Sequence, residues 1–229
     1  MNIIVNGGTR GIGKEVVICL AHDVSNQIIV TGRNEKGLKS LSERFQNVRT
    51  FVLDLANFDS QIESFSNAIQ SHFERIDILI NMAGSLVSKK FMDIANNEAR
   101  IMMETNFFGP ASMIRIIKPL MPGGSHIVNI SSMGGFQGSE KYQGLSYYSA
   151  SKAALASLTE SLAPEFAEYG ISVNCLALGS VQTEMFEEAF PGYKALVNAR
   201  EMAEFITDFA LNGNKFFNGK ILPVAKNNP

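Results

Sequence analysis

Short apolar runs alternate with amphipathic stretches along the whole chain. Seven runs rich in β-branched residues predict strands at 2–6, 27–31, 48–53, 76–80, 125–130, 171–176 and 218–224. The run Ile-Asp-Ile-Leu-Ile at 76–80 is almost continuously apolar, which is typical of a strand buried on both faces of a parallel sheet. The stretches between the runs have helical periodicity, so the alternation indicates βαβ units. We therefore predict an α/β fold in one domain covering residues 1–229, with a doubly wound parallel sheet of about seven strands and helices on both faces.

The first strand ends in a glycine-rich loop, Asn-Gly-Gly-Thr-Arg-Gly-Ile-Gly at 6–13, which leads into a helical stretch. Gly7 would permit a tight turn, Gly11 would let the backbone approach a pyrophosphate, and Gly13 would let the helix pack on the strand. The helix N-terminus would offer free N–H groups to the phosphates. This order favours a Rossmann-type dinucleotide site, and the alternative is an ordinary strand-to-helix turn with three glycines.

Two arginines bear on which dinucleotide would bind. NAD sites usually carry Asp or Glu about 20 residues beyond the glycines, but Arg33 stands there and the next carboxylate is Glu35. Arg10 lies inside the glycine loop. Because guanidinium groups bind phosphate through a planar fork, the pair favours NADP(H) over NAD(H). The alternative is that both side chains face solvent.

Tyr148 and Lys152 are four residues apart in a helical stretch and so share one face. A nearby positive charge lowers a phenol pKa from its usual value of about 10, which makes the pair a candidate acid or base. Tyr142 and Tyr147 have serines at the same spacing. Ser132, after the fifth strand, can donate to a substrate oxygen, and no His/Asp pair is placed to make it a nucleophile. The alternative interpretation of Tyr148 and Lys152 is a solvated surface pair.

Two further segments bear on this site. Pro110 interrupts a helical stretch at 97–118 and leaves the carbonyl four residues back, that of Asn106, without its donor. That carbonyl could hold a water, or the interruption could serve packing alone. Residues 184–200 are rich in Met, Phe and Tyr and contain a Pro-Gly pair. We predict a substrate lid there, with a pair of surface helices as the alternative.

The composition argues against several classes of protein. The net charge is −2 with no basic run, so neither nucleic acid nor a membrane surface is expected as a partner. No apolar run approaches the roughly 20 residues that span a bilayer, and the chain enters a strand at Ile3, so we expect no signal peptide. Cys19 and Cys175 lie in apolar segments, which indicates buried thiols and a cytoplasmic location. The three histidines are far apart, so no metal is predicted.

Taken in order, these motifs resemble those of the classical short-chain dehydrogenase/reductase family over essentially the whole chain. Residues 6–13 resemble T-G-x-x-x-G-x-G with Asn6 in place of Thr, and 81–84 resemble N-N-A-G with Met82 in place of Asn. Residues 178–183 are similar to P-G-x-[IV]-x-T, with Leu178 in place of Pro. The last strand is similar to N-G-x-x-[IV]-x-V-D-G-G, but Ala-Lys-Asn stands in place of D-G-G. The departures bear on sheet contacts, on the loop over the nicotinamide and on the C-terminal tail.

The resemblance implies a catalytic tetrad of Asn106, Ser132, Tyr148 and Lys152. Ser132 would donate to the substrate oxygen and Tyr148 would exchange a proton with it. Lys152 would lower the pKa of the tyrosine and bind the nicotinamide ribose, while Asn106 would anchor a water. The implied cofactor-binding residues are Gly7, Thr9, Arg10, Gly11, Ile12, Gly13, Arg33, Asp54, Leu55, Asn81, Ala83, Gly84, Lys152, Gly179, Val181 and Thr183. Among these, Asp54 and Leu55 would flank the adenine.

The resemblance implies an NADP(H)-dependent oxidoreductase that transfers hydride to a carbonyl or from a secondary alcohol, with a small molecule as substrate. A 3-oxoacyl thioester is one candidate substrate, and a homodimer or homotetramer is implied. One alternative is a non-catalytic NADP(H)-sensing regulator on the same fold, whose mark would be loss of the tetrad; the tetrad is complete. Another is an isomerase or dehydratase, whose relatives usually carry a longer substrate domain than the short segment after Thr183.

Overall fold

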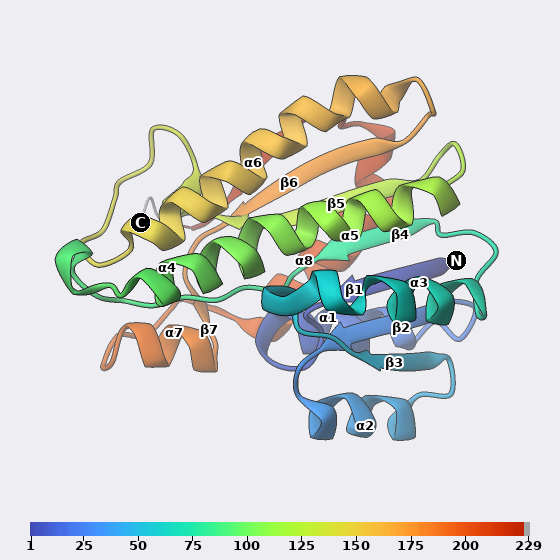
Figure 1. The fold of residues 1–229 in the computed structure, drawn as a ribbon, viewed down its shortest axis with the longest axis horizontal. Coiled ribbons are helices and arrows are strands. Elements are labelled where there is room, and N and C mark those ends of the chain that lie inside the picture. Colours follow the sequence, from blue (N-terminus) through green and yellow to red (C-terminus); the bar gives the residue numbers. More distant parts are fainter. Residues whose placement is uncertain (227–229) are drawn as a thin grey trace.

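The computed structural model describes residues 1–226, which contain a parallel sheet of seven strands in the order β3-β2-β1-β4-β5-β6-β9 (Figure 1). The strands are β1 (Asn2–Asn6), β2 (Gln27–Gly32), β3 (Val48–Val52), β4 (Ile78–Asn81), β5 (His126–Ser132), β6 (Ser172–Leu178) and β9 (Ile221–Val224). The chain winds outward from β1 in one direction and then from β4 in the other, so the carboxyl ends of β1 and β4 flank the switch point. Ligands bind at this point in such sheets. The predicted α/β sheet is confirmed.

Helices cover both faces of the sheet (Figure 1). One face carries α1 (Gly11–Ala21), α2 (Glu35–Arg44) and α8 (Ala199–Asn212), and the other carries α3 (Ile62–Gln70), α5 (Gly109–Ile117) and α6 (Ser146–Ala167). Two apolar cores result, because successive residues of a strand point to opposite faces. Along β1, Ile3 and Val5 join the first core, whereas Ile4 joins the second. No helix in the described part of the chain is long and apolar enough to cross a membrane.

Shorter elements connect these layers. They are η1 (Leu55–Gln61), η2 (Phe91–Asp93), α4 (Asn96–Met103), the π-helical η3 (Glu104–Phe108), η4 (Lys118–Leu120), η5 (Met133–Gly135), β7 (Val181–Gln182), α7 (Glu184–Ala189), β8 (Val197–Asn198) and η6 (Gly213–Lys215). The pairing of β7 with β8 ties residues 181–182 to 197–198, so the segment between them is held at both ends. Two-residue strands carry too little apolar pattern to be predicted from sequence. The departure at Asn227 lies outside the described residues.

The break near Pro110 takes a specific form. The helical stretch predicted at 97–118 consists of α4, a π-helical turn and α5, and the Gly109 N–H donates to the Glu104 carbonyl five residues back. Proline has no N–H to continue the ordinary pattern, and wider single turns of this kind are frequent at functional sites. The turn contains Thr105 and Asn106, both buried. The interruption is therefore confirmed, and its water-binding role stays a prediction.

Five buried side chains form a hydrogen-bonded chain across the middle of the sheet, called here the buried polar chain: Thr31, Asn6, Asn81, Asn129 and Thr159. The distances along it are 3.0, 3.4, 2.9 and 2.9 Å, and each residue is at most 1 % exposed. The first four are aligned register partners on β2, β1, β4 and β5, so their side chains project from the same face. Thr159 lies on α6, so the chain joins the sheet to that helix.

His126 begins β5 and is a buried histidine, 1 % exposed. Its Nδ1 lies 3.0 Å from the Ala210 carbonyl oxygen, and its Nε2 lies 3.0 Å from the Asn174 side-chain nitrogen. A carbonyl only accepts and an amide NH₂ only donates, so the ring is neutral with its proton on Nδ1. Burial lowers the pKa of His126 from 6.5 to about 4, although the bond to the Ala210 carbonyl opposes this shift.

This histidine predicts a pH dependence of stability. As pH falls from 6.5 to about 4, the unfolded chain binds a proton at His126 that the native chain does not, so the free energy of unfolding decreases. The loss from this group reaches about 3 kcal/mol at the lower end. In His126→Gln this contribution disappears, and urea unfolding at several pH values should show a shallower dependence over the same window. An unchanged slope would contradict this account.

Candidate active site

The glycine loop brings the backbone of two strands unusually close. Gly7 has φ +89°, and a Cβ built on it would lie 2.4 Å from the Ala83 nitrogen, in the loop after β4. A Cβ on Gly13 would lie 2.2 Å from the Gly7 carbonyl oxygen. Any side chain at either position would force the backbone apart. Arg10, the N-cap of α1, makes no side-chain capping hydrogen bond, so the helix N-terminus keeps N–H groups for an anion.

An open cleft lies at this carboxyl edge. Its position at the switch point of the sheet suits a dinucleotide. Most of the predicted cofactor residues line it: Gly7, Thr9, Arg10, Gly11, Ile12, Gly13, Arg33, Asp54, Leu55, Ala83, Gly84 and Thr183. The glycine cradle and the free N–H groups of α1 fit the phosphates of NADP(H) or NAD(H).

Four predicted cofactor residues do not line this cleft. The Asn81 side chain is bonded within the buried polar chain. Gly179 packs against Ala225, whose Cβ would lie 2.6 Å from a Cβ built on the glycine. Val181 is buried in the core shared with α1 and α8. The fourth, Lys152, adjoins the cleft at Gly84. Their contacts with a cofactor stay predictions.

The cleft is also lined by Glu184 and Met185, which begin the predicted lid, and by residues that sequence reasoning missed: Asn6, Gly32, Leu53, Met82, Thr105 and Ile130. Several of these stand at the ends of predicted strands, so strand position could have identified them. Thr105 carries no such signal, because it lies within a helical stretch beside Asn106.

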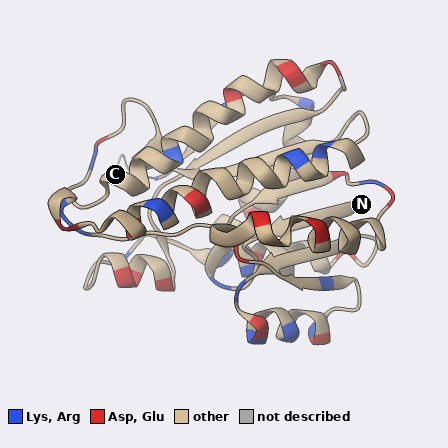
Figure 2. Ribbon diagram, viewed as in Figure 1, with Lys and Arg blue, Asp and Glu red and all other residues tan. Residues whose placement is uncertain are grey.

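Arg10 and Arg33 both line the cleft and a neighbouring polar recess beneath α7. Arg10 lies 3.8 Å from the Glu188 carboxylate of α7, in an exposed pair. Such a pair contributes little to stability. At the end of β2, the Asn34 side chain accepts from the Gly37 N–H and caps α2. Figure 2 shows acidic residues on α7 and a mixture of both charges on the outer helices.

Lys152 lies on α6 with its side chain directed at the end of β5. It is 4 % exposed, and its Nζ donates to the Ile130 carbonyl at 2.9 Å. The Ser131 hydroxyl donates to the Lys152 carbonyl at 2.8 Å. Burial lowers the pKa of Lys152 to about 8. A Cβ built on Gly84, in the cleft wall, would lie 3.6 Å from Nζ, so the ammonium adjoins the cleft.

Tyr148 is half-buried in the first turns of α6, one turn before Lys152. Burial raises its pKa above the ordinary value, and a hydrogen bond with the Ser132 hydroxyl opposes that rise. This net shift is opposite to the lowering expected from Lys152, and the effect of Lys152 on the tyrosine in a cofactor complex stays a prediction. In the structure, Lys152 donates to the Ile130 carbonyl and burial weakens its own charged form. The phenol is consequently protonated at neutral pH.

Ser132 has an oriented hydroxyl. Its oxygen accepts from the Gly134 N–H at 3.1 Å. This bond occupies an acceptor site and leaves the O–H free to donate towards Tyr148 or a bound oxygen. Gly135 keeps this turn close to α6, because a Cβ there would lie 2.6 Å from the Ala153 nitrogen. The structure thus brings Ser132 and Tyr148 together.

Asn106 acts in the structure through its side chain. Its Nδ2 donates to the Ser85 carbonyl and to the Ser151 hydroxyl, each at 2.9 Å, and its Oδ1 accepts from the Ser85 N–H at 2.7 Å. The Ser151 hydroxyl in turn donates to the Tyr148 carbonyl at 2.7 Å. Asn106 therefore links the loop after β4 to the turn of α6 that carries Tyr148.

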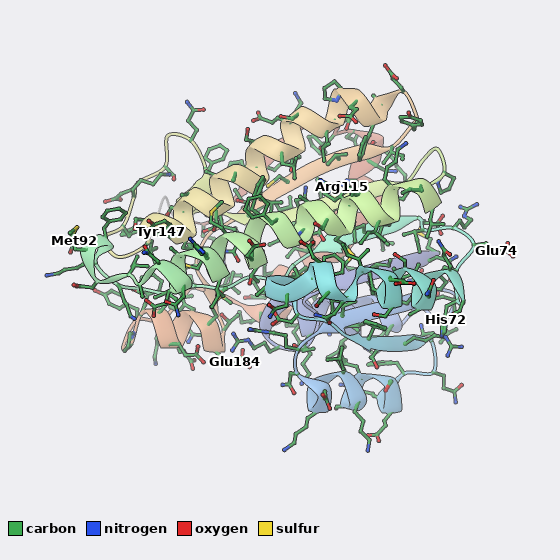
Figure 3. The ribbon with its side chains drawn as sticks, viewed as in Figure 1. His72, Glu74, Met92, Arg115, Tyr147 and Glu184 are labelled. Atoms are coloured by element: carbon green, nitrogen blue, oxygen red, sulfur yellow. The ribbon has the colours of Figure 1, made fainter. Side chains whose placement is uncertain are left out.

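The segment 184–200 lies beside this site. The Thr183 hydroxyl accepts from the Phe186 N–H and begins α7, and Met185 lines the cleft. Tyr147 stacks on Phe91 with ring centroids 5.7 Å apart. In Figure 3, Tyr147 and Met92 lie at the end of the molecule towards which α7 extends. The placement is consistent with a lid, which stays a prediction.

The fold and the site define a class: a dinucleotide-binding oxidoreductase with a tyrosine beside a serine and a lysine at the sheet edge. Within residues 1–226, no group of three or more His, Cys, Asp or Glu residues is placed to hold a metal ion. The chain belongs to the short-chain dehydrogenase family, whose model matches residues 1–194. The resemblance inferred from the motifs is therefore confirmed.

Related proteins agree with this assignment. An uncharacterized oxidoreductase of Staphylococcus epidermidis is 28 % identical over 205 residues, covering 89 % of this chain and 87 % of that protein. Another, from Staphylococcus saprophyticus, is 29 % identical over 208 residues, covering 88 % of this chain and 87 % of that protein. These relatives support a dehydrogenase or reductase and name no substrate.

Solved structures share the fold. A mutant of a Serratia marcescens short-chain dehydrogenase/reductase matches with a TM-score of 0.86 at 24 % identity, over 97 % of this chain and 95 % of that one. A short-chain dehydrogenase from Burkholderia cenocepacia, solved in complex with NADP, matches with a TM-score of 0.86 at 22 % identity, with the same coverage. At these identities the likeness shows the fold alone.

Proposed function

We propose that the protein is an NADP(H)-dependent reductase of carbonyl compounds, or dehydrogenase of the corresponding secondary alcohols. One observation carries the proposal: the half-buried phenol of Tyr148, paired with a serine hydroxyl, lies one helical turn from a lysine that adjoins a glycine-lined cleft. A hydride transfer at a carbonyl needs a bound nicotinamide and a proton for the oxygen, and this arrangement provides places for both.

The side chains have separate roles in the proposed reaction. When bound, the nicotinamide supplies the hydride in reduction and accepts it in oxidation. Tyr148 gives its proton to the substrate oxygen in reduction, which its raised pKa suits because the phenol stays protonated. Ser132 donates a hydrogen bond to the same oxygen, since its acceptor site is taken by the Gly134 N–H. Both groups therefore favour charge developing on that oxygen.

Lys152 supports the proton donor in this proposal. Its pKa of about 8 lets it release or take a proton near neutral pH. Its Nζ adjoins Gly84 in the cleft wall, which supports a role for Lys152 in binding a ribose hydroxyl. Once Tyr148 loses its proton, the ammonium one turn away stabilises the phenolate. The lowering of the Tyr148 pKa by Lys152 that the sequence predicts would then occur in the complex with cofactor and substrate.

The choice of NADP(H) over NAD(H) rests on charge. Arg10 and Arg33 line the cleft together, and a 2′-phosphate is a ligand that guanidinium groups bind well. Asn34, directly after Arg33, is occupied in capping α2. The pair of Arg10 with Glu188 is exposed and long at 3.8 Å, so a phosphate can replace the carboxylate at little cost.

The substrate proposed is a small, partly apolar carbonyl compound. Met185 lines the cleft, the Phe186 and Phe190 rings of the predicted lid lie 5.3 Å apart, and Tyr147 stacks on Phe91 nearby. A 3-oxoacyl thioester belongs in the first panel of substrates.

We also propose a homodimer or homotetramer, because α6 exposes small residues such as Ala150 and Ala153 that allow close packing. The cytoplasmic location stays a prediction.

Tyr148→Phe tests the proton donor. The variant keeps the ring and removes the hydroxyl, so turnover should fall by about 100-fold or more, while NADPH affinity stays within about two-fold. Initial rates and a fluorescence titration measure the two quantities. Tyr147→Phe is the matched control and should keep its turnover. A Tyr148→Phe enzyme with more than about a tenth of the wild-type rate would remove Tyr148 from this role.

Arg33→Ala tests the cofactor preference. Loss of a charge-assisted bond to phosphate should weaken NADPH binding by about 10- to 100-fold and leave NADH binding nearly unchanged. Calorimetric titration with each cofactor measures both. Arg49→Ala, an exposed arginine on β3 outside the cleft, is the control. Equal losses for NADPH and NADH would mean that Arg33 does not contact the 2′-phosphate.

A further inference from the structure

Thr105 has a buried hydroxyl with no hydrogen-bond partner among the described residues. The residue is 6 % exposed. A threonine in a helix normally donates to the carbonyl three or four residues back, as Thr159 does to the Leu155 carbonyl at 3.1 Å. Thr105 lies in the π-helical turn, where the wider spacing disturbs that geometry. An unpaired buried hydroxyl is costly, so it calls for an explanation.

The position of Thr105 supplies one, because the residue lines the cleft. It lies opposite the start of η1, where a Cβ built on Gly109 would lie 2.7 Å from the Leu55 Cβ, so the π-helical turn packs against Leu55. Leu55 and Asp54 follow β3, the strand beyond β2 and its Arg33. Thr105 therefore lies on the side of the cleft that carries Asp54 and Leu55, where the adenosine is expected to bind.

Threonine can present either a methyl or a hydroxyl group to the cleft. Both groups sit on one carbon, so rotation about χ1 exchanges them between staggered positions. The hydroxyl both donates and accepts, and adenosine offers ring nitrogens, an amino group and ribose hydroxyls as partners. Rotation of the Thr105 side chain breaks no hydrogen bond within the described residues, so a cofactor that binds the hydroxyl does not have to displace one.

We propose that Thr105 is a cofactor-binding residue whose hydroxyl hydrogen-bonds the adenosine moiety of NADP(H). This inference rests on the proposed function and adds a contact that the motif residues do not include. It also explains why the orphaned hydroxyl is tolerated: the bound cofactor supplies its partner.

The test compares three variants by calorimetric titration with NADPH, adenosine 2′,5′-bisphosphate and nicotinamide mononucleotide. Thr105→Val keeps the shape and removes the hydroxyl, so it should weaken NADPH and the bisphosphate equally, by about three- to ten-fold. Binding of the mononucleotide should not change. Thr105→Ser keeps the hydroxyl and should bind within about two-fold of wild type.

Thr207→Val is the matched control. Thr207 is the other buried threonine whose hydroxyl makes no hydrogen bond to an oxygen or nitrogen among the described residues, and its neighbour is the Cys19 thiol. It lies on α8 and does not line the cleft. Its removal should leave all three affinities unchanged. Without cofactor, Thr105→Val should not melt below wild type, because an unpaired buried hydroxyl contributes no stabilising bond.

The outcomes separate the two proposals. Wild-type protein that binds neither NADPH nor the bisphosphate would reject the proposed function and this inference with it. Wild-type binding with an unchanged Thr105→Val affinity would overturn the inference alone. A Thr105→Val protein that melts several degrees lower without cofactor would also overturn it, by showing that the hydroxyl bonds within the protein.

Discussion

The buried polar chain is the constraint on which the site depends. Each of its amides both donates and accepts, so Thr31, Asn6, Asn81 and Asn129 join four adjacent strands in register. Breaking one link would leave a buried polar group unpaired, at a cost of about 1–3 kcal/mol. The final link, from Asn129 to Thr159, fixes α6 against β5. Asn6, which stands where the family has threonine, accepts from Thr31 and donates to Asn81 in the buried polar chain.

The alignment has chemical consequences. With β5 fixed against α6, the Ile130 carbonyl meets the Lys152 ammonium and Ser132 meets Tyr148. Asn106 then ties the loop after β4 to the same helix through Ser151. Burial acts in opposite directions on the two titrating groups, raising the pKa of the phenol and lowering that of the ammonium. Both shifts favour the neutral forms of the two groups.

Much of this was predictable from sequence, because period and spacing determine which residues share a face. The seven strands, the close approach permitted by Gly7 and Gly13, and the two arginines in one cleft follow from such local rules. The direction of the Tyr148 pKa shift could not be predicted in this way, because residue spacing reveals neither the burial of the phenol nor the Ile130 carbonyl that binds Lys152. Thr105 was missed for a similar reason: its missing partner depends on a π-helical turn and on tertiary packing.

The central claim is that this site couples a bound reduced nicotinamide to protonation of a carbonyl oxygen. The most direct measurement follows the absorbance of NADPH during incubation with wild-type protein and a panel of ketones, aldehydes and 3-oxoacyl thioesters. The account predicts loss of reduced nicotinamide that depends on one class of carbonyl and forms an equal amount of alcohol. Tight binding of NADPH with no turnover of any carbonyl would contradict it and favour a sensor of the dinucleotide.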